Sequence, residues 1–444
     1  MARRYFGTDG IRGRVGTSPM TVDFALRLAG AAARVLTPQG GRVMIGKDTR
    51  VSGYMFESAL EAGFVAAGVD VLLTGPLPTP AVAYVTSISD TDFGIVISAS
   101  HNPYYDNGIK FFDVEGEKLS EDVEEEIERQ LEVPPRTRDS KSLGRATIAS
   151  FARTDYMKFC KQTVPEGMDF NGLKIVVDAS HGAGYKVAPR VIGELGADVI
   201  PVGCSPNGLN INDGCGSTRP DLLQLNVVGV RADVGVALDG DGDRLVMVDE
   251  QGNLVDGDKL LYVLACDRRE TNTLTGPVVG TLMSNLGLER ALTERGIEFL
   301  RTRIGDRNVR ATLKEHGGIL GGEPSGHLLC LDKINTGDGL ITALQILAIM
   351  RRTGRSLSQL VAGMPQLPQT LVNVEIGEPV EISAQPAISD AVEAAESALG
   401  HTGRVVLRAS GTEPVIRVMV EGEDQAMVQA LATRLADSVR SACG

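Results

Sequence analysis

The chain has 444 residues, of which 43% are hydrophobic and 23% are charged, and its formal net charge is −13. One core cannot serve this length, since domains mostly run to about 100–150 residues, so we expect three or four globular domains. The acidic balance argues against a nucleic-acid partner, and it means that an anionic substrate needs a local basic pocket.

No signal peptide or membrane segment is expected. The N-terminus lacks the apolar core of a signal peptide, and the longest apolar stretches, 260–266 and 341–350, are too short to span a bilayer. Six cysteines are scattered without a Cys-x-x-Cys pair, which favours reduced thiols over a disulfide frame or a zinc site. We therefore expect a cytoplasmic protein with no membrane partner.

Strands and helices alternate through the first part of the chain. The predicted strands cover residues 42–46, 69–73 and 93–98, and the predicted helices cover 53–67 and 120–131. Ser120 is expected to cap the second helix, with Asp122 and Glu124 near the positive end of its dipole. The Pro-rich, charged segment 132–144 is typical of a linker that ends a first domain.

Two further runs repeat the strand, loop and helix plan, and the tail differs. Strands are predicted at 173–178, 197–202, 232–238, 278–282 and 299–303, with a helix over 338–352. The tail predicts strands at 371–376, 405–407 and 415–420 and helices at 388–399 and 425–441, a β-α-β-β-α order. We therefore expect three similar α/β domains around a cleft and a small α+β domain, with boundaries at 1–150, 151–253, 254–366 and 367–444.

A polar loop follows the apolar run 94–97. Its sequence from Ser98 to Pro103 is Ser-Ala-Ser-His-Asn-Pro, and function often lies where such strands end. A hydroxyl at this place can act as a nucleophile or carry a phosphoryl group. On the loop alone, a polar Asn-Pro turn is an equally good interpretation.

A second loop, 239–244, alternates acids and glycines as Asp-Gly-Asp-Gly-Asp-Arg. Three carboxylates this close can surround a hard cation, and without one they raise each other's pKa. An EF-hand is rejected, because its sixth position needs Gly and here is Arg244, and because the residues that follow predict a strand. Mg²⁺ is preferred to Ca²⁺, since it commonly works with a phosphate oxygen and few carboxylates.

Two more loops offer groups that bind sugars and phosphates. The loop 321–327 presents Glu323, Ser325 and His327 among glycines, which suits sugar hydroxyls, although a structural turn is an equal alternative. The loop 408–414 places Ser, Gly and Thr between Arg408 and Arg417, which suits an anion. It is not a P-loop, because no Gly-Lys-Ser/Thr ends it, and a hairpin with two surface arginines is the alternative.

Taken together, these loops make the chain resemble the α-D-phosphohexomutase superfamily over essentially its full length, and within it the bacterial phosphoglucosamine mutases. The matching segments are residues 4–13, 98–103 with 107–110, 239–243, 322–327 and 408–414. Pro324 departs mildly from the family pattern, in which Gln or a similar residue is common, but it leaves Glu323 and Ser325 in place.

The resemblance implies a heart-shaped arrangement of four domains and a phosphoserine enzyme. Ser100 is implied as the phosphorylated residue, giving its phosphoryl group to glucosamine 6-phosphate through a 1,6-bisphosphate intermediate to yield glucosamine 1-phosphate for peptidoglycan precursors. Arg12, His101, Lys110 and His327 are implied near the reacting oxygen, with the general acid or base left open among them.

The implied ligand sets follow the four loops. Mg²⁺ is implied on Ser100, Asp239, Asp241 and Asp243. The hexosamine phosphate is implied to contact Arg244, Glu323, Ser325, His327, Arg408, Ser410, Gly411, Thr412 and Arg417. Glucose or glucosamine 1,6-bisphosphate is implied as an activator, and a homodimer stays open.

Three alternatives remain from the sequence. A phosphoglucomutase or phosphomannomutase differs only in its sugar, and relative turnover of the three 6-phosphates separates them. A metal-dependent phosphatase with an aspartyl nucleophile needs Asp-x-Asp after its first strand, whereas these acids lie past residue 230. A sugar-phosphate sensor without turnover is disfavoured by the intact Ser100 and three aspartates.

Overall fold

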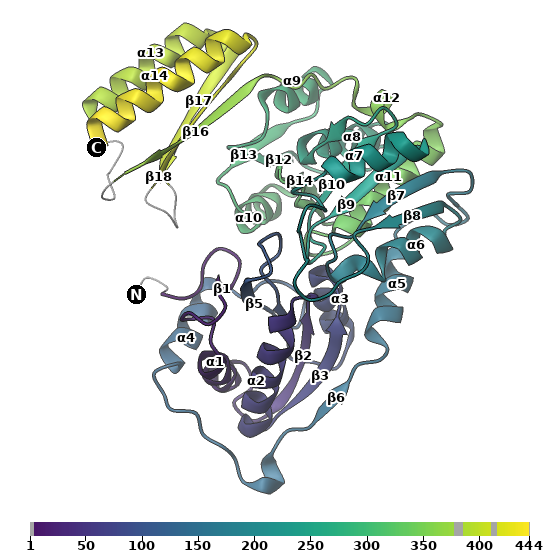
Figure 1. The fold of residues 1–444 in the computed structure, drawn as a ribbon, viewed down its shortest axis with the longest axis vertical. Helices are drawn as coiled ribbons and strands as arrows, with labels where there is room; N and C mark the ends of the chain where they lie inside the picture. The colour runs from purple at the N-terminus through teal and green to yellow at the C-terminus, as the bar shows by residue number, and fades with distance from the viewer. Residues whose placement is uncertain (1–3, 377–384, 410–414, 444) are drawn as a thin grey trace.

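The computed structural model describes residues 4–376, 385–409 and 415–443, and it builds them around four sheets that follow one another along the chain (Figure 1). We refer to the sheet units as the first, second, third and fourth domain. Within the described residues, no helix is both long and apolar enough to cross a membrane.

The first domain has a mixed six-stranded sheet. In sheet order its strands are β1 (Ile11–Arg14), β5 (Asp106–Phe112), β4 (Phe93–Ile97), β2 (Gly41–Lys47), β3 (Val69–Pro76) and β6 (Ala146–Ile148). Its helices are α1 (Val22–Leu36), α2 (Val51–Ala67), α3 (Thr79–Ile88) and α4 (Glu121–Gln130). Strand β4 pairs in parallel with β2 and antiparallel with β5, and it is buried along its whole length, as its apolar run predicts.

The second domain has a five-stranded sheet in which β7, β8 and β9 are parallel. In sheet order the strands are β11 (Leu254–Val255), β10 (Leu245–Asp249), β9 (Val234–Leu238), β7 (Lys174–Asp178) and β8 (Asp198–Val202). The helices are α5 (Ala152–Gln162), α6 (Ala188–Glu194) and α7 (Asp221–Val230). Strand β10 returns antiparallel to β9, so the loop between them lies at the carboxyl end of β9.

The third domain has a four-stranded sheet and a largely buried helix, α11 (Gly339–Thr353). Its strands in sheet order are β13 (Phe299–Thr302), β12 (Val278–Thr281), β14 (Leu320–Gly322) and β15 (Leu328–Cys330). Its helices are α8 (Gly257–Glu270), α9 (Leu286–Glu294), α10 (Asp306–His316), α11 (Gly339–Thr353) and α12 (Leu357–Val361). One apolar cluster joins Val82, Val236 and Leu344, so the first three domains share a packed core.

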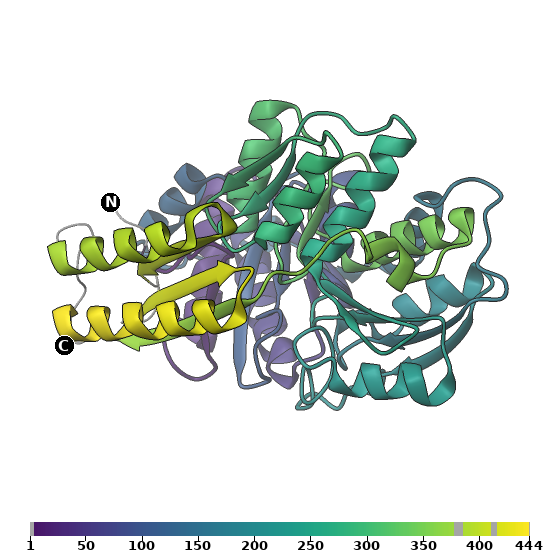
Figure 2. The same cartoon turned by 90° about the horizontal axis from the view of Figure 1, so that it is seen from above.

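The fourth domain confirms the predicted β-α-β-β-α order. It comprises β16 (Gln369–Glu375), α13 (Pro386–Leu399), β17 (Gly403–Ala409), β18 (Val415–Gly422) and α14 (Gln425–Cys443). Its three strands are antiparallel in the order β16-β18-β17, and both helices lie on one face of the sheet (Figure 2). It has its own apolar core and contacts the third domain through an ion pair between Arg290 and Glu423.

Two local expectations differ from the structure. Ser120 occupies the N-cap position of α4, but its side chain makes no capping hydrogen bond. The segment 132–144 contains a short 3₁₀ turn, Ser140–Ser142, and leads into β6, which completes the first sheet. The chain therefore leaves the first domain only after β6, and the boundaries given above stay predictions.

Candidate active site

The loop after β4 places Ser100 in a buried and strained position. Ser100 has φ +52°, a left-handed conformation that L residues rarely adopt, and its side chain is almost fully buried. Its Oγ donates a hydrogen bond of 2.5 Å to Asp239 Oδ2, and its N–H donates to Ser98 Oγ at 2.9 Å. A buried hydroxyl of the first domain thus contacts a carboxylate of the second.

The Asp loop between β9 and β10 gathers the three predicted carboxylates. One oxygen from each of Asp239, Asp241 and Asp243 lies within 4.8 Å of the others, and all three residues are buried. Burial, together with the charges of Asp243 and Asp241, raises the pKa of Asp239 well above its ordinary value. Asp241 Oδ1 and Asp243 Oδ1 have no hydrogen-bond partner. Buried carboxylate oxygens without hydrogen-bond partners fit a divalent cation such as Mg²⁺.

Backbone geometry shapes the Asp loop. Asp239 Oδ1 accepts hydrogen bonds from the N–H groups of Gly242, at 3.0 Å, and Arg244, at 3.2 Å. Gly242 has φ +76°, which glycine adopts without strain. The alternation of Gly and Asp therefore allows a tight turn that points its carboxylates to one side.

Lys110 and Arg12 bring positive charge to these acids. Lys110 Nζ on β5 lies 2.8 Å from Asp241 Oδ2 and 2.9 Å from Asp9 Oδ2. Burial opposes its charge, yet Asp241, Asp9 and Asp243 raise the pKa of Lys110 above its ordinary value. Arg12 on β1 pairs with Asp9. Both cations therefore stay charged near the Asp loop and can offset negative charge gathered there.

His101 lies next to the serine hydroxyl. Its Nδ1 is 3.4 Å from Ser100 Oγ. Burial, followed by the charges of Arg244 and Arg12, lowers the pKa of His101 to about 4, so the ring is neutral near pH 7 in this arrangement.

The turn between β14 and β15 brings the third domain to the site. His327 lies with Nδ1 3.8 Å from Asp243 Oδ1. Burial opposes its charge, but Asp243 and Asp306 raise the pKa of His327 above its ordinary value. Glu323 Oε1 accepts a hydrogen bond of 3.0 Å from the N–H of Gly305. Ser325, by contrast, is exposed at the tip of the turn.

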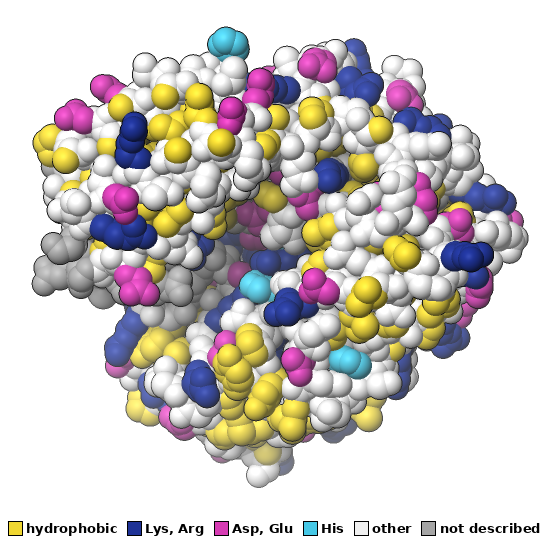
Figure 3. Space-filling view, turned by 45° about the horizontal axis from the view of Figure 1, so that its top comes forward, with side chains coloured by type: hydrophobic (Ala, Val, Ile, Leu, Met, Phe, Trp, Pro, Cys, Tyr) yellow, Lys and Arg dark blue, Asp and Glu magenta, His cyan; other side chains and the backbone are white. Residues whose placement is uncertain are grey.

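A cavity of about 560 Å³ lies beside these groups, although Ser100, Asp239, Asp241 and Lys110 are not among the described residues that line it. It is lined by residues of the first three domains, and the predicted site residues among them are Arg12, His101, Asp243, Arg244, Glu323 and His327. Figure 3 shows the molecule hollowed between its lobes, with charged side chains gathered in the hollow. A sugar phosphate fits a cavity of this size and polarity.

The predicted phosphate clamp lies partly outside the described residues, which exclude Ser410, Gly411 and Thr412. Arg408 on β17 and Arg417 on β18 are described and stand opposite each other in the antiparallel register. Burial and the neighbouring charge of Arg417 lower the pKa of Arg408. The described residues that line the cavity include neither arginine. The structure therefore keeps these two cations together without bringing them to Ser100.

Sequence reasoning missed the residues that hold the Ser100 loop. Arg50 is fully buried, and its Nη2 donates to the carbonyls of Ser100, at 3.2 Å, and Asn102, at 2.5 Å. Asn212 of the second domain donates to the same two carbonyls, at 2.9 and 3.0 Å. Arg50 stands in the Asp-Thr-Arg run that follows strand β2, and this polar strand end was the available signal. Asn212 carries no comparable sequence signal.

Comparison with family descriptions covers nearly the whole chain. Residues 3–135, 154–252 and 256–367 match the alpha/beta/alpha domains I, II and III of phosphoglucomutase/phosphomannomutase, and residues 371–438 match its C-terminal domain. The four matches occur in the order of the four sheets.

Curated relatives are similar over their full length. The chain is 57% identical over 445 residues to phosphoglucosamine mutase of Thioalkalivibrio sulfidiphilus, covering 99% of each chain. It is 54% identical over 444 residues to phosphoglucosamine mutase of Salmonella newport, again covering 99% of each.

Solved structures share the architecture. A phosphoglucomutase/phosphomannomutase family protein of Burkholderia thailandensis superposes with a TM-score of 0.81 at 25% identity, over 98% of this chain and 97% of that one. N-acetylphosphoglucosamine mutase of Aspergillus fumigatus, solved with GlcNAc-6P and magnesium, has a TM-score of 0.70 at 18% identity, over 99% and 96%. At that identity the second likeness concerns the fold alone.

Proposed function

The chain belongs to the phosphoglucomutase/phosphomannomutase family of α-D-phosphohexomutases, and from this premise we propose that it interconverts glucosamine 6-phosphate and glucosamine 1-phosphate. It is an isomerase, like its relatives named phosphoglucosamine mutase at 54–57% identity. The observation that carries the mechanism is the hydrogen bond of 2.5 Å from Ser100 Oγ to Asp239, beside two further buried carboxylates.

The reaction is two phosphoryl transfers through Ser100. In the first, the bond between phosphorus and Oγ of phosphorylated Ser100 breaks as phosphorus bonds to the free hydroxyl oxygen of the sugar monophosphate. The proton of that hydroxyl ends on Oγ, so the products are a neutral serine and a 1,6-bisphosphate. In the second, the phosphoryl group that the substrate originally carried is transferred from its sugar oxygen to Oγ. The bond between phosphorus and that sugar oxygen breaks, and the serine proton passes to the oxygen. Charge neutralisation and positioning dominate such transfers.

Asp239, Asp241 and Asp243 are the residues that would hold Mg²⁺, with Ser100 or its phosphate beside them. When bound, the ion supplies a positive charge that stabilises the transferring phosphoryl group. Lys110, which contacts two of these carboxylates, and Arg12, which pairs with Asp9, supply the protein's own positive charges. The acid–base role stays open among Arg12, His101, Lys110 and His327.

Most residues proposed to recognise the substrate belong to the third and fourth domains. Glu323 and His327 line the cavity. The Glu323 carboxylate can accept hydrogen bonds from sugar hydroxyls, and the His327 ring can donate or accept them. Arg244 adds a positive charge at the cavity wall. Ser325 and the loop with Ser410, Gly411 and Thr412 are proposed as further sugar and phosphate contacts. Arg408 and Arg417 are proposed to hold the phosphate that is not being transferred, which requires the fourth domain to approach the cavity.

Activity measurements test this function directly. The purified protein, primed with glucose 1,6-bisphosphate, is assayed with the 6-phosphates of glucosamine, glucose and mannose. We expect the highest kcat/KM with glucosamine 6-phosphate and a gain in intact mass by one phosphoryl group, removable by a phosphatase. Preference for glucose or mannose would assign a different sugar in the same family, and release of inorganic phosphate as the main product would contradict a mutase.

A further inference from the structure

Six acidic and basic side chains form a closed ring beside the reacting serine. In order around the ring they are Asp243, Lys110, Asp9, Lys118, Asp306 and His327, with acids and bases alternating. The ring draws on the first, second and third domains. Asp9, Asp243, Asp306 and His327 line the active-site cavity, and Lys110 contacts the Asp loop. Lys118 and Asp306 have no role in the proposed chemistry.

Lys118 links two domains within this ring. Its Nζ lies 2.5 Å from Asp9 Oδ1 of the first domain, and it also pairs with Asp306 Oδ2, on the first residue of α10 in the third domain. Only 16% of the Lys118 side chain is exposed. Because both carboxylates share this one ammonium group, its removal leaves two partly buried anions facing each other.

Each of these carboxylates also contacts a residue of the reacting centre. Asp9 Oδ2 lies 2.9 Å from Lys110 Nζ, and Asp306 Oδ2 lies 3.5 Å from His327 Nε2. A shift of Asp9 or Asp306 therefore displaces Lys110 or His327, which lie 2.8 Å from Asp241 Oδ2 and 3.8 Å from Asp243 Oδ1. Lys118 thus contacts Lys110 only through Asp9 and His327 only through Asp306.

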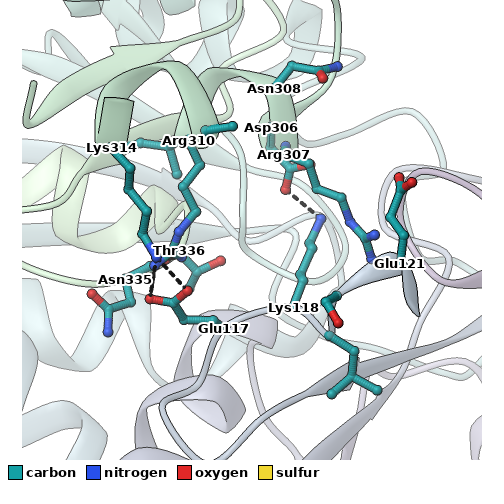
Figure 4. A pocket seen from close by; sticks show the side chains of 14 residues that line it. Glu117, Lys118, Glu121, Asp306, Arg307, Asn308, Arg310, Lys314, Asn335 and Thr336 are labelled. Atoms are coloured by element: carbon teal, nitrogen blue, oxygen red, sulfur yellow. Dashed lines mark hydrogen bonds and ion pairs between the residues drawn. The ribbon is translucent and has the colours of Figure 1, made fainter. Parts of the chain in front are cut away.

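Lys118 itself lies behind the cavity wall. It lines a second pocket, of about 380 Å³, between α10 and the segment before α4, and Asp306 lines both this pocket and the active-site cavity (Figure 4). The pair of Lys118 and Asp306 is therefore part of the partition between the two spaces. From this place the ammonium group does not line the cavity that the sugar phosphate would occupy.

Other ion pairs already join the same two domains. Glu117 accepts hydrogen bonds from Lys314, at 2.8 Å, and from Arg310 (Figure 4). Arg307 also donates to Glu124 at 3.1 Å. These pairs hold α10 against the first domain, and none of their side chains is a member of the ring. The contact between the domains thus does not depend on Lys118 alone, so its effect on reaction geometry can be separated from its effect on stability.

We propose that Lys118 is a positioning residue for phosphoryl transfer, which fixes Asp9 and Asp306 so that Lys110 and His327 stay aimed at the Ser100 phosphoryl group. The inference rests on the proposed function and adds to it a residue that touches neither the sugar nor the phosphate. It predicts that loss of the Lys118 charge impairs the transition state more than substrate binding.

The test compares Lys118→Met, which keeps length and removes charge, with Lys118→Arg, which keeps the charge. We expect Lys118→Met to lower kcat tenfold or more with KM for glucosamine 6-phosphate within about threefold, and Lys118→Arg to recover most of the loss. The matched control is Lys314→Met, which removes a cation from the same domain boundary outside the ring. It is expected to leave kcat and KM within about twofold of wild type.

Double substitution keeps the inference falsifiable if Lys118→Met loses stability. In a cycle with Asp306→Asn, the double variant should be impaired no more than the worse single variant, because the two residues act as one unit. Equal kinetics for the Lys118 and Lys314 variants, a rise in KM with unchanged kcat, or additive effects in the cycle would each overturn the proposal.

A second readout separates this inference from the proposed function. The rate at which Ser100 gains a phosphoryl group from glucose 1,6-bisphosphate, followed by intact mass, needs no mutase turnover. A wild type that is phosphorylated but does not convert glucosamine 6-phosphate contradicts the proposed function alone. A Lys118→Met variant that is phosphorylated as fast as wild type contradicts the positioning role alone.

Discussion

Asn212 Nδ2 donates a hydrogen bond of 2.9 Å to the carbonyl oxygen of Ser100, a residue 112 positions away in the chain and in another domain. Arg50 reaches the same carbonyl from within the first domain, at 3.2 Å. Ser100 has φ +52°, and its backbone is held by the nearby Ser98 hydroxyl as well as by these two distant side chains. The conformation of Ser100 is therefore held by contacts from both the first and the second domain.

Removal of the Asn212 amide is expected to slow transfer rather than weaken binding. Asn212→Ala deletes the two hydrogen bonds to the Ser100 and Asn102 carbonyls, and each such bond is typically worth about 0.5–1.5 kcal/mol, so kcat should fall at least roughly two- to tenfold with KM nearly unchanged. Steady-state kinetics measure this, with Asn226→Ala, a surface amide on α7, as the matched control. A change in KM alone would show that the amide acts on the substrate.

Ser100→Ala is expected to abolish turnover and phosphorylation while the fold persists. The change removes the oxygen that carries the phosphoryl group but only one buried hydrogen bond, to Asp239. Mutase assays and intact mass after incubation with glucose 1,6-bisphosphate measure both effects, and circular dichroism checks the fold. The exposed Ser140→Ala is the control. A phosphorylated, active Ser100→Ala protein would exclude Ser100 as the acceptor.

Asp241→Asn is expected to weaken Mg²⁺ binding and to remove Mg²⁺-dependent activity. Two carboxylates hold the ion less well than three, and Asp241 Oδ1 has no other partner. Calorimetric titration with Mg²⁺ measures the affinity, and the exposed Asp221→Asn serves as control. Ca²⁺ should bind the wild type yet support little turnover, because it favours more ligands and looser geometry. Undiminished wild-type activity in excess chelator would rule out the metal role.

The sequence predicts the parts of the site that lie close together along the chain. The run Phe93–Ile97 is apolar throughout, so its burial and the position of Ser100 at its end were predictable. The three aspartates alternate with glycine within one turn, so their convergence follows from local geometry alone. These features need no knowledge of how the domains pack.

The supporting contacts could not be predicted, because they join distant segments. Lys118 and Asp306 are 188 positions apart, and neither belongs to a motif. Single polar residues in loops carry no periodic signal, and their partners are determined by tertiary packing. The predicted elements also omit α1, although its buried residues recur at helical spacing, and the short strands β14 and β15, which offer only three residues each.

Asp258 is expected to make stability depend on pH. Burial, together with Asp256, raises the pKa of Asp258 to about 7 from an ordinary 3.8. Between these values the folded state binds more protons than the unfolded state, so the free energy of unfolding falls as pH rises through this window. Asp258→Asn removes the charge and should raise Tm relative to wild type by more at pH 8 than at pH 4.

Thermal unfolding at both pH values measures this difference. Asp221→Asn, on an exposed site, should show no such pH-dependent gain. Asp258 Oδ1 is a buried oxygen without a hydrogen-bond partner, so the neutral amide leaves no anion uncompensated there. An equal Tm difference at the two pH values would mean that Asp258 is ionised in the folded protein across the whole range.

Arg417 is expected to anchor the phosphate that is not being transferred, in both directions of the reaction. A charge-assisted bidentate contact is worth about 1.5–3 kcal/mol, and an anchor contributes equally to the ground and transition states. Arg417→Ala should therefore raise KM roughly tenfold or more, with a smaller fall in kcat. The exposed Arg434→Ala on α14 is the matched control in the same domain.

Because the sugar must turn round between the two transfers, one clamp has to accept either phosphate. The increase in KM should thus occur with glucosamine 6-phosphate and with glucosamine 1-phosphate alike, and initial rates in both directions measure it. A defect confined to one direction would show that each phosphate has its own binding residues and that Arg417 is not the shared anchor.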